Sequence, residues 1–310
     1  MKILVNFIGL LILAINTYAQ NITDTFDYEK KTNYSGQVVS TQEIDSLVML
    51  EKIVIDGHDS NIPFYHFQNK RNQNGPYIIL LHGLGGSKED WVYPSMPYLQ
   101  WSKDLTAIKD SLLTLGFNIL IPDAKYHGER SYELNFRPAG QLPPMLSKNQ
   151  EDGKNFNVMM TSTIKDIRII MDYIQQRNKE IKTAFSLVGY SMGAAIAILL
   201  NASDDRIVSV VACAPPLNHP QKEAATLNWP EEIEQALATV TPQNYSNLQQ
   251  SPILLLLGEQ DVFYTKEEVI SFYEDVPIQQ KEVKYFNSGH VLPTDYINDV
   301  ISWITKDYYK

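Results

Sequence analysis

Short apolar runs and longer segments with helical spacing alternate along this chain from about residue 75 onward. Nearly every residue of the short runs is apolar, as strands buried on both faces require. The runs are Tyr77–Leu81, Asn118–Ile121, Phe185–Val188, Ile207–Ala212, Ile253–Leu257 and Val283–Phe286. Helical spacing predicts helices at Leu105–Leu115, Thr161–Gln176, Met192–Asn201, Lys266–Tyr273 and Thr294–Tyr309. The alternation predicts an α/β fold with a mainly parallel central sheet and helices on both of its faces.

The segments outside this alternation complete the expected organisation. Leu47–Ile55 and Ile62–Phe67 flank a turn and predict an antiparallel hairpin at one edge of the sheet. Two stretches at about 131–159 and 215–245, rich in proline and polar residues, are interpreted as insertions that form a cap over the active site. Residues 20 to about 35 are expected to be an arm that is either flexible or ordered late in folding. No repeat or linker divides residues 20–310, which predicts a single domain.

The N-terminal segment is typical of a secretory signal peptide. Lys2 precedes an apolar stretch, Ile3 to Ile15, and Thr17-Tyr18-Ala19 places small residues at both positions that determine cleavage. About 13 largely apolar residues are fewer than the roughly 20 that span a bilayer, so stable membrane insertion is not expected. Removal of residues 1–19 would leave a secreted or periplasmic protein.

Charge and cysteine content exclude several classes of function. The chain has 26 basic and 36 acidic side chains, a net charge of −10, and no basic cluster of the kind that follows a phosphate backbone, so nucleic acid is not an expected partner. The single cysteine, Cys213, lies in a run that predicts a buried strand and allows no intramolecular disulfide. No H-E-x-x-H motif or close histidine pair of the metal-ligand type is present, so the sequence implies neither a metal nor a cofactor.

The segment Gly189-Tyr190-Ser191-Met192-Gly193 has the pattern of a nucleophile elbow. It follows a predicted buried strand and opens an alanine-rich helical segment. Such an elbow lifts a serine above the sheet on a strained turn, and the flanking glycines let strand and helix approach each other. By itself the pattern is weak evidence, because it also occurs by chance. Its position between a predicted strand and a predicted helix makes it strong evidence that Ser191 is the nucleophile.

The base and the acid are expected after the serine, in the order acid and then histidine. His290 follows the last predicted strand, whereas the other histidines lie upstream of the serine, in a turn or in an insertion. Asp261 follows the run Ile253–Leu257 and lies far enough into the loop to reach the histidine, unlike its rival Glu259. The catalytic residues are therefore predicted to be Ser191, Asp261 and His290.

The run His82-Gly83-Leu84-Gly85-Gly86 leaves a predicted strand and can supply backbone donors for an oxyanion. We assign the oxyanion donors as the main-chain N–H groups of Leu84 and Met192. His82 itself is expected to brace this loop.

These features together resemble the α/β-hydrolase superfamily from about residue 75 to 305, and within it the dienelactone-hydrolase-related esterases. Pro122–Arg130 is similar to the superfamily's common Asp-x-x-Gly-His-Gly-x-Ser segment, but Tyr126 and Arg130 replace its glycine and its serine. The resemblance implies an α/β-hydrolase fold, and a serine at the elbow favours acyl transfer to water.

The sequence therefore predicts a secreted serine esterase that acts on a small-molecule or oligosaccharide ester. A peptidase or thioesterase on the same fold is an alternative, and a non-catalytic binding module is another. The acyl group, the alcohol and the oligomeric state are left open by the sequence.

Overall fold

A computed structural model of the chain describes residues 24–93, 100–135, 148–178 and 184–306. The proposed signal peptide, residues 1–19, and part of the first predicted insertion lie outside these ranges.

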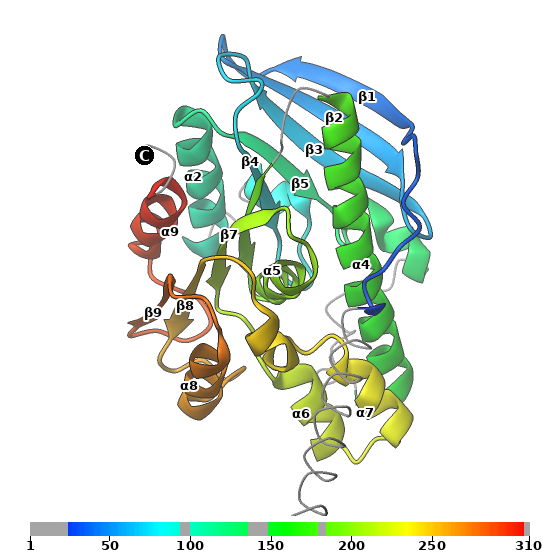
Figure 1. Ribbon diagram of the computed structural model, residues 1–310, viewed down its shortest axis with the longest axis vertical. Coiled ribbons are helices and arrows are strands. Elements are labelled where there is room, and N and C mark those ends of the chain that lie inside the picture. Colours follow the sequence, from blue (N-terminus) through cyan, green and yellow to red (C-terminus); the bar gives the residue numbers. More distant parts are fainter. Residues whose placement is uncertain (1–23, 94–99, 136–147, 179–183, 307–310) are drawn as a thin grey trace, which may run out of the picture.

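A nine-stranded sheet forms the centre of the molecule (Figure 1). Its order is β1-β2-β3-β5-β4-β6-β7-β8-β9. The six strands β5-β4-β6-β7-β8-β9 are parallel to one another. The pairs β1·β2, β2·β3 and β3·β5 are antiparallel. The strands are β1 (Gly36–Glu43), β2 (Val48–Asp56), β3 (Asn61–Asn69), β4 (Tyr77–Leu81), β5 (Asn118–Pro122), β6 (Phe185–Tyr190), β7 (Ile207–Cys213), β8 (Ile253–Gly258) and β9 (Lys281–Phe286). The predicted mixed sheet is confirmed.

Helices cover both faces of the sheet (Figure 1). One face carries α2 (Gln100–Thr114) and α9 (Tyr296–Thr305), and the other carries α4 (Gln150–Arg177), α5 (Met192–Ser203) and α8 (Lys266–Asp275). Between β7 and β8 lie α6 (His219–Thr226), α7 (Glu231–Ala238) and the 3-10 helix η4 (Pro242–Leu248). Two further 3-10 helices are η1 (Lys88–Trp91) and η2 (Gly128–Leu134).

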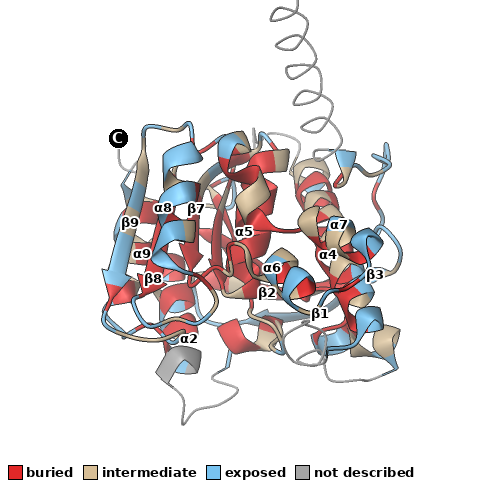
Figure 2. Cartoon of the chain, turned by 90° about the horizontal axis from the view of Figure 1, so that it is seen from below, coloured by how far each residue is buried: buried red, intermediate tan, exposed pale blue. Residues whose placement is uncertain are grey.

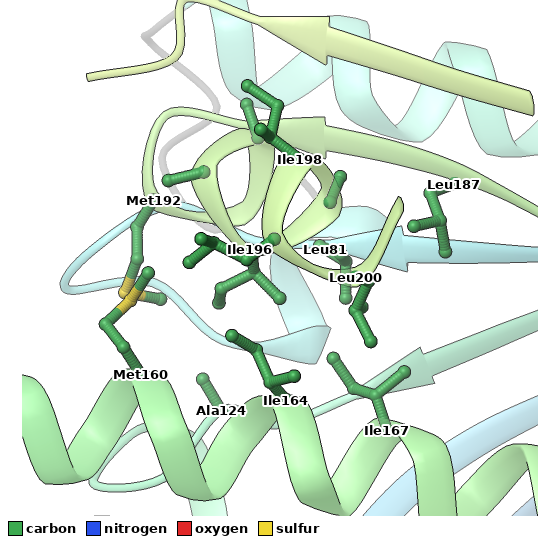
Figure 3. Packing of buried hydrophobic residues seen from close by; sticks show 14 of the residues in the cluster. Leu81, Ala124, Met160, Ile164, Ile167, Leu187, Met192, Ile196, Ile198 and Leu200 are labelled. Atoms are coloured by element: carbon green, nitrogen blue, oxygen red, sulfur yellow. The ribbon is translucent and has the colours of Figure 1, made fainter. Parts of the chain in front are cut away.

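Alternate side chains of the central strands enter two separate apolar cores. Ile79 and Leu81 of β4 pack with α4 and α5, whereas Ile78 and Leu80 pack with α2 and α9. Every residue of α5 from Met192 to Ala202 is buried (Figure 2). Figure 3 shows Ile196 of α5 facing Ile164 of α4. Burial on this scale fixes α5, and with it the turn that precedes α5.

Three elements differ from the sequence-based expectation. The polar strand β1, exposed at all eight residues, lies outside the predicted hairpin at the sheet edge. β9 is not buried on both faces, because it is the opposite edge strand and its side chains alternate in exposure. The predicted helix at Thr161–Gln176 is the second part of α4, which begins at Gln150.

The described part of the expected N-terminal arm is docked on the domain and not flexible. Phe26 is fully buried against the ring of Tyr245. The hydroxyls of Tyr28 and Tyr34 both donate to Oδ2 of Asp172 on α4, at 2.6 and 2.8 Å. The arm is held because Asp172, a buried carboxylate, needs hydrogen-bond donors. Within the described ranges, no helix is both long enough and apolar enough to cross a membrane.

Candidate active site

Four loops meet at one edge of the sheet, where the parallel strands β4, β6, β8 and β9 end. Because parallel strands point the same way, the residues that follow them gather at a common edge. Ser191 follows β6, Asp261 follows β8, His290 follows β9, and the glycine loop His82–Gly86 follows β4.

Ser191 occupies a strained turn between β6 and α5. Its backbone has φ 54° and ψ −117°, and its N–H donates to the carbonyl of Cys213 at 2.8 Å. A Cβ atom on Gly189 would lie 2.2 Å from the carbonyl oxygen of Gly193, and one on Gly193 would lie 2.2 Å from that of Leu81. The turn therefore requires glycine on both sides of the serine, and the strain is held by the buried strand and helix.

The side chains of Ser191, His290 and Asp261 form one hydrogen-bonded chain. Nε2 of His290 lies 2.9 Å from Oγ of Ser191, and Nδ1 lies 2.7 Å from Oδ2 of Asp261. An ionised carboxylate only accepts, so Nδ1 carries the proton and Nε2 is left to accept from the serine hydroxyl. The side chain of Asp261 is fully buried, whereas that of His290 is 28% exposed.

The loop that carries Asp261 is held by its own hydrogen bonds. Oδ1 of Asp261 accepts from the N–H of Phe263 at 3.0 Å, which leaves Oδ2 for the histidine. The hydroxyl of Tyr264 accepts from the N–H of Gly258 at 2.8 Å and so closes the base of the loop. Glu259, the rival in the sequence, is exposed. The ring of Phe263 lies 4.5 Å, centroid to centroid, from that of His290.

The elbow and the histidine loop are joined through Tyr190. Its hydroxyl donates to the carbonyl of His290 at 2.9 Å and accepts from the N–H of Leu292 at 2.9 Å. Burial raises the pKa of Tyr190 well above its usual range, so the hydroxyl keeps the proton that it donates.

The glycine loop forms a tight turn beside the serine. The N–H of Gly86 donates to the carbonyl of Gly83 at 3.1 Å, and Gly85 has φ 78°, as a type II turn requires at its third residue. A Cβ atom on Gly83 would lie 3.6 Å from Cβ of Ser191. Leu84 thus lies in a loop that contacts the serine, and Met192 opens α5, where the first N–H groups have no partner within the helix.

The segment Asp123–Arg130 packs under the glycine loop. Oδ1 of Asp123 accepts from the N–H of Lys88, and Oδ2 accepts from the N–H of Glu129 and from Nζ of Lys88. Tyr126, which stands where the similar motif has glycine, has φ 67°. This left-handed conformation costs a non-glycine residue roughly 1–2 kcal/mol and explains why glycine is favoured there.

Arg130, at the motif's serine position, is fully buried. Its guanidinium donates to Asp166 at 2.7 Å, to Glu133 at 2.9 Å and to Ser60 at 2.9 Å. It therefore ties η2 to α4 and to the turn that precedes β3.

Sequence reasoning missed the bridging residues. His127, whose Nε2 accepts from the N–H of Gly85 in the glycine loop, precedes the serine and is therefore no candidate for the base. Tyr190 occupies the variable position of the elbow pattern. The His127-Gly128 pair, within a recognised motif, was the available signal for the first. No local signal identifies Tyr190, because its partners lie 100 and 102 residues away.

Comparison with known proteins gives one family and several similar structures. A family model described as "Alpha/beta hydrolase family" matches residues 78–285, which include Ser191 and Asp261 and end before His290. The chain is 23% identical over 270 residues to "Putative esterase YitV" of Bacillus subtilis (strain 168), and the alignment covers 79% of this chain and 94% of that protein.

Acetyl xylan esterase 1 from Thermoanaerobacterium sp. JW/SL YS485 superposes with a TM-score of 0.67 at 14% identity, covering 94% of this chain and 92% of that one. An acetyl xylan esterase from Paenibacillus sp. R4 gives 0.63 at 16% identity, with coverage of 94% and 92%. An esterase from Pyrococcus furiosus gives 0.57 at 18% identity, with coverage of 90% and 99%. At these identities the likeness establishes the fold.

Proposed function

This chain belongs to the alpha/beta hydrolase family, and we propose that it is a serine hydrolase that cleaves carboxylic esters. The observation that carries the proposal is the hydrogen-bonded chain Ser191–His290–Asp261. The names of the similar proteins, all of which describe esterases, support ester hydrolysis.

In the proposed reaction, His290 accepts the Ser191 proton through Nε2 as the hydroxyl oxygen attacks the ester carbonyl. Asp261 holds the proton on Nδ1 and stabilises the imidazolium. The N–H groups of Leu84 and Met192 donate to the oxyanion of the tetrahedral intermediate. His290 then returns the proton to the departing alcohol, which leaves an acyl group on Ser191. A water molecule, deprotonated by the same histidine, attacks the acyl carbonyl. The bond to Oγ of Ser191 then breaks, His290 returns the proton to Oγ, and the acid is released.

The substrate is proposed to be a small-molecule or oligosaccharide ester. Because two similar structures are acetyl xylan esterases, acetylated sugars belong in a substrate panel beside simple acetate, longer acyl and feruloyl esters, with a thioester and a peptide as contrasts. The α6–α7 insertion, residues 215–245, together with residues near 131–159, is proposed to cap the site.

We also propose that residues 1–19 are removed and that the mature protein is periplasmic or extracellular. Mass spectrometry of the processed protein tests this step. A mature chain that begins at Gln20 is expected, and one that retains Met1 contradicts it.

The deciding experiment compares Ser191→Ala with Ser203→Ala. Ser203 lies at the other end of α5, where its hydroxyl donates to the carbonyl of Leu199 at 2.8 Å, so it is a matched control. Ser191→Ala is expected to lower p-nitrophenyl acetate turnover by more than about 1,000-fold and to abolish labelling by a fluorophosphonate, with unchanged thermal unfolding. Near-normal turnover by this variant, or a label on another residue, would refute the proposal.

A further inference from the structure

Two buried histidines connect the glycine loop to the segment Asp123–Arg130 in a reciprocal manner. Nε2 of His82, in the glycine loop, accepts from the N–H of Ala124 at 3.0 Å. Nε2 of His127, in the other segment, accepts from the N–H of Gly85 at 3.0 Å. The two rings lie 5.1 Å apart, centroid to centroid, and both are almost fully buried. We call this arrangement, His82 and His127 with their backbone partners, the histidine clasp.

The hydrogen bonds fix the tautomer of each ring. Nδ1 of His82 lies 2.9 Å from the carbonyl of Gly83, and Nδ1 of His127 lies 2.8 Å from that of Lys125. A carbonyl oxygen only accepts, so each Nδ1 carries the proton and each Nε2 is an acceptor. Both imidazoles must therefore be neutral, and burial holds the pKa of each below its usual value, to about 3 for His127.

The clasp acts on the two peptide groups that flank the Cα atom of Leu84. The first contains the carbonyl of Gly83 and the N–H of Leu84. A trans peptide is planar, and its C=O and N–H point in opposite directions. The bond from His82 to that carbonyl, together with the turn bond from the N–H of Gly86, therefore also sets the direction of the Leu84 N–H. The second contains the N–H of Gly85, which His127 holds.

We propose that His82 and His127 are positioning residues that hold the Leu84 N–H toward the oxyanion before substrate binds. This inference rests on the proposed function, because the Leu84 N–H has an oxyanion to bind only if the protein hydrolyses esters. The second segment is anchored through Asp123, which accepts two hydrogen bonds from Lys88 just after the glycine loop and one from Glu129 within the segment. A preorganised donor needs no reorganisation during the reaction, whereas a displaced donor loses part of the roughly 100- to 1,000-fold effect of an oxyanion donor.

Asparagine and glutamine replacements separate the two nitrogens of each ring. An asparagine amide reaches the position of Nδ1, and a glutamine amide reaches that of Nε2. His82→Asn therefore keeps the bond to Gly83, and His82→Gln loses it. At position 127 the order is reversed, because His127→Gln keeps the bond from Gly85 and His127→Asn loses it.

The expected result is a crossover between the two positions. His82→Gln and His127→Asn should lower kcat for p-nitrophenyl acetate by about 10- to 100-fold, with KM within about threefold and a matching fall in the rate of fluorophosphonate labelling. His82→Asn and His127→Gln should stay within about threefold of wild type. A packing role gives no such reversal, so equal losses at each position, or losses that follow thermal stability, would overturn the inference.

Amide hydrogen exchange keeps this test separate from the proposed function. The Gly85 amide is expected to exchange faster in His127→Asn than in His127→Gln and wild type, whether or not any ester is cleaved. Equal exchange overturns the clasp itself. The wild-type protein could instead lack both ester hydrolysis and labelling while His127→Asn still exchanges faster. That result would refute the proposed function and the catalytic purpose of the clasp, but not the clasp itself.

Discussion

The hydroxyl of Tyr190 donates to the backbone carbonyl of His290 across 100 residues of sequence. Tyr190 directly precedes Ser191, so the strand that presents the proposed nucleophile also holds the loop of the proposed base. The same hydroxyl accepts from Leu292 on the other side of the histidine. The side chain of Tyr190 thus links the end of β6, which leads into Ser191, to the backbone of the loop that carries the imidazole.

Removal of this hydroxyl is expected to loosen the imidazole. Tyr190→Phe keeps the ring but leaves the buried N–H of Leu292 without its acceptor, which destabilises the protein by about 1–3 kcal/mol. We expect kcat to fall by roughly tenfold or more while KM stays within about threefold. Steady-state kinetics and urea unfolding measure the two effects. In the control, Tyr273→Phe, a hydroxyl that donates to Lys281 at the other end of β9 is lost, and kcat should not change. Equal kinetics in both variants would contradict the bridging role.

The two carboxylates after β8 should differ sharply in their effect on turnover. Asp261→Asn replaces a buried acceptor that fixes the Nδ1 proton, so kcat is expected to fall by about 1,000- to 10,000-fold. Glu259→Gln changes an exposed side chain, and its kcat should remain within about twofold of wild type. Ester turnover of the two purified variants measures this difference. The assignment of the acid fails if Glu259→Gln is the more damaging change.

The elbow glycine should be much less tolerant than the glycine of the neighbouring loop. Gly189→Ala forces a Cβ atom to 2.2 Å from a backbone oxygen, and we expect a loss of about 3 kcal/mol or more in the free energy of unfolding, or no folded protein. Gly83→Ala places its Cβ no closer than 3.6 Å to any neighbouring atom and should lose less than about 1 kcal/mol. Thermal unfolding compares them. Similar melting temperatures would show that the elbow can relax.

Stability is expected to fall as the solution becomes acidic, because His66, His82 and His127 are buried with lowered pKa values. Below the ordinary histidine pKa of about 6.5, these histidines bind protons in the unfolded chain but stay neutral in the folded chain. Each such histidine then contributes up to about 1.4 kcal/mol of destabilisation per pH unit, down to about pH 3 for His127.

Urea unfolding between pH 6.5 and 5 measures how the free energy of unfolding changes with pH. His127→Gln should reduce this slope by up to the contribution of one histidine, about 1.4 kcal/mol per pH unit. An identical slope in that variant would mean that His127 is protonated in the folded protein.

The sequence predicted the sheet, its hairpin and the three side chains that the structure joins in one hydrogen-bonded chain; their catalytic role stays a prediction. Apolar runs and the direction of parallel strands carry this information locally. β1 was missed because an edge strand that is exposed along its whole length has no apolar alternation. The start of α4 was missed because polar residues there, such as Asn157, bind another segment rather than the sheet.

Helix α4 connects distant parts of the molecule. Its 28 residues span about 42 Å at 1.5 Å per residue. Near its beginning, Asn157 donates to Thr239 at the end of α7 at 3.1 Å, and near its end, Asp172 receives the N-terminal arm. A chimaera that borrows the α6–α7 insertion of a relative must therefore import the opening turns of this helix as well. The α6–α7 insertion and the first turns of α4 therefore have to be exchanged together. Recombination boundaries placed only at residues 215 and 245 would remove the contact between Asn157 and Thr239.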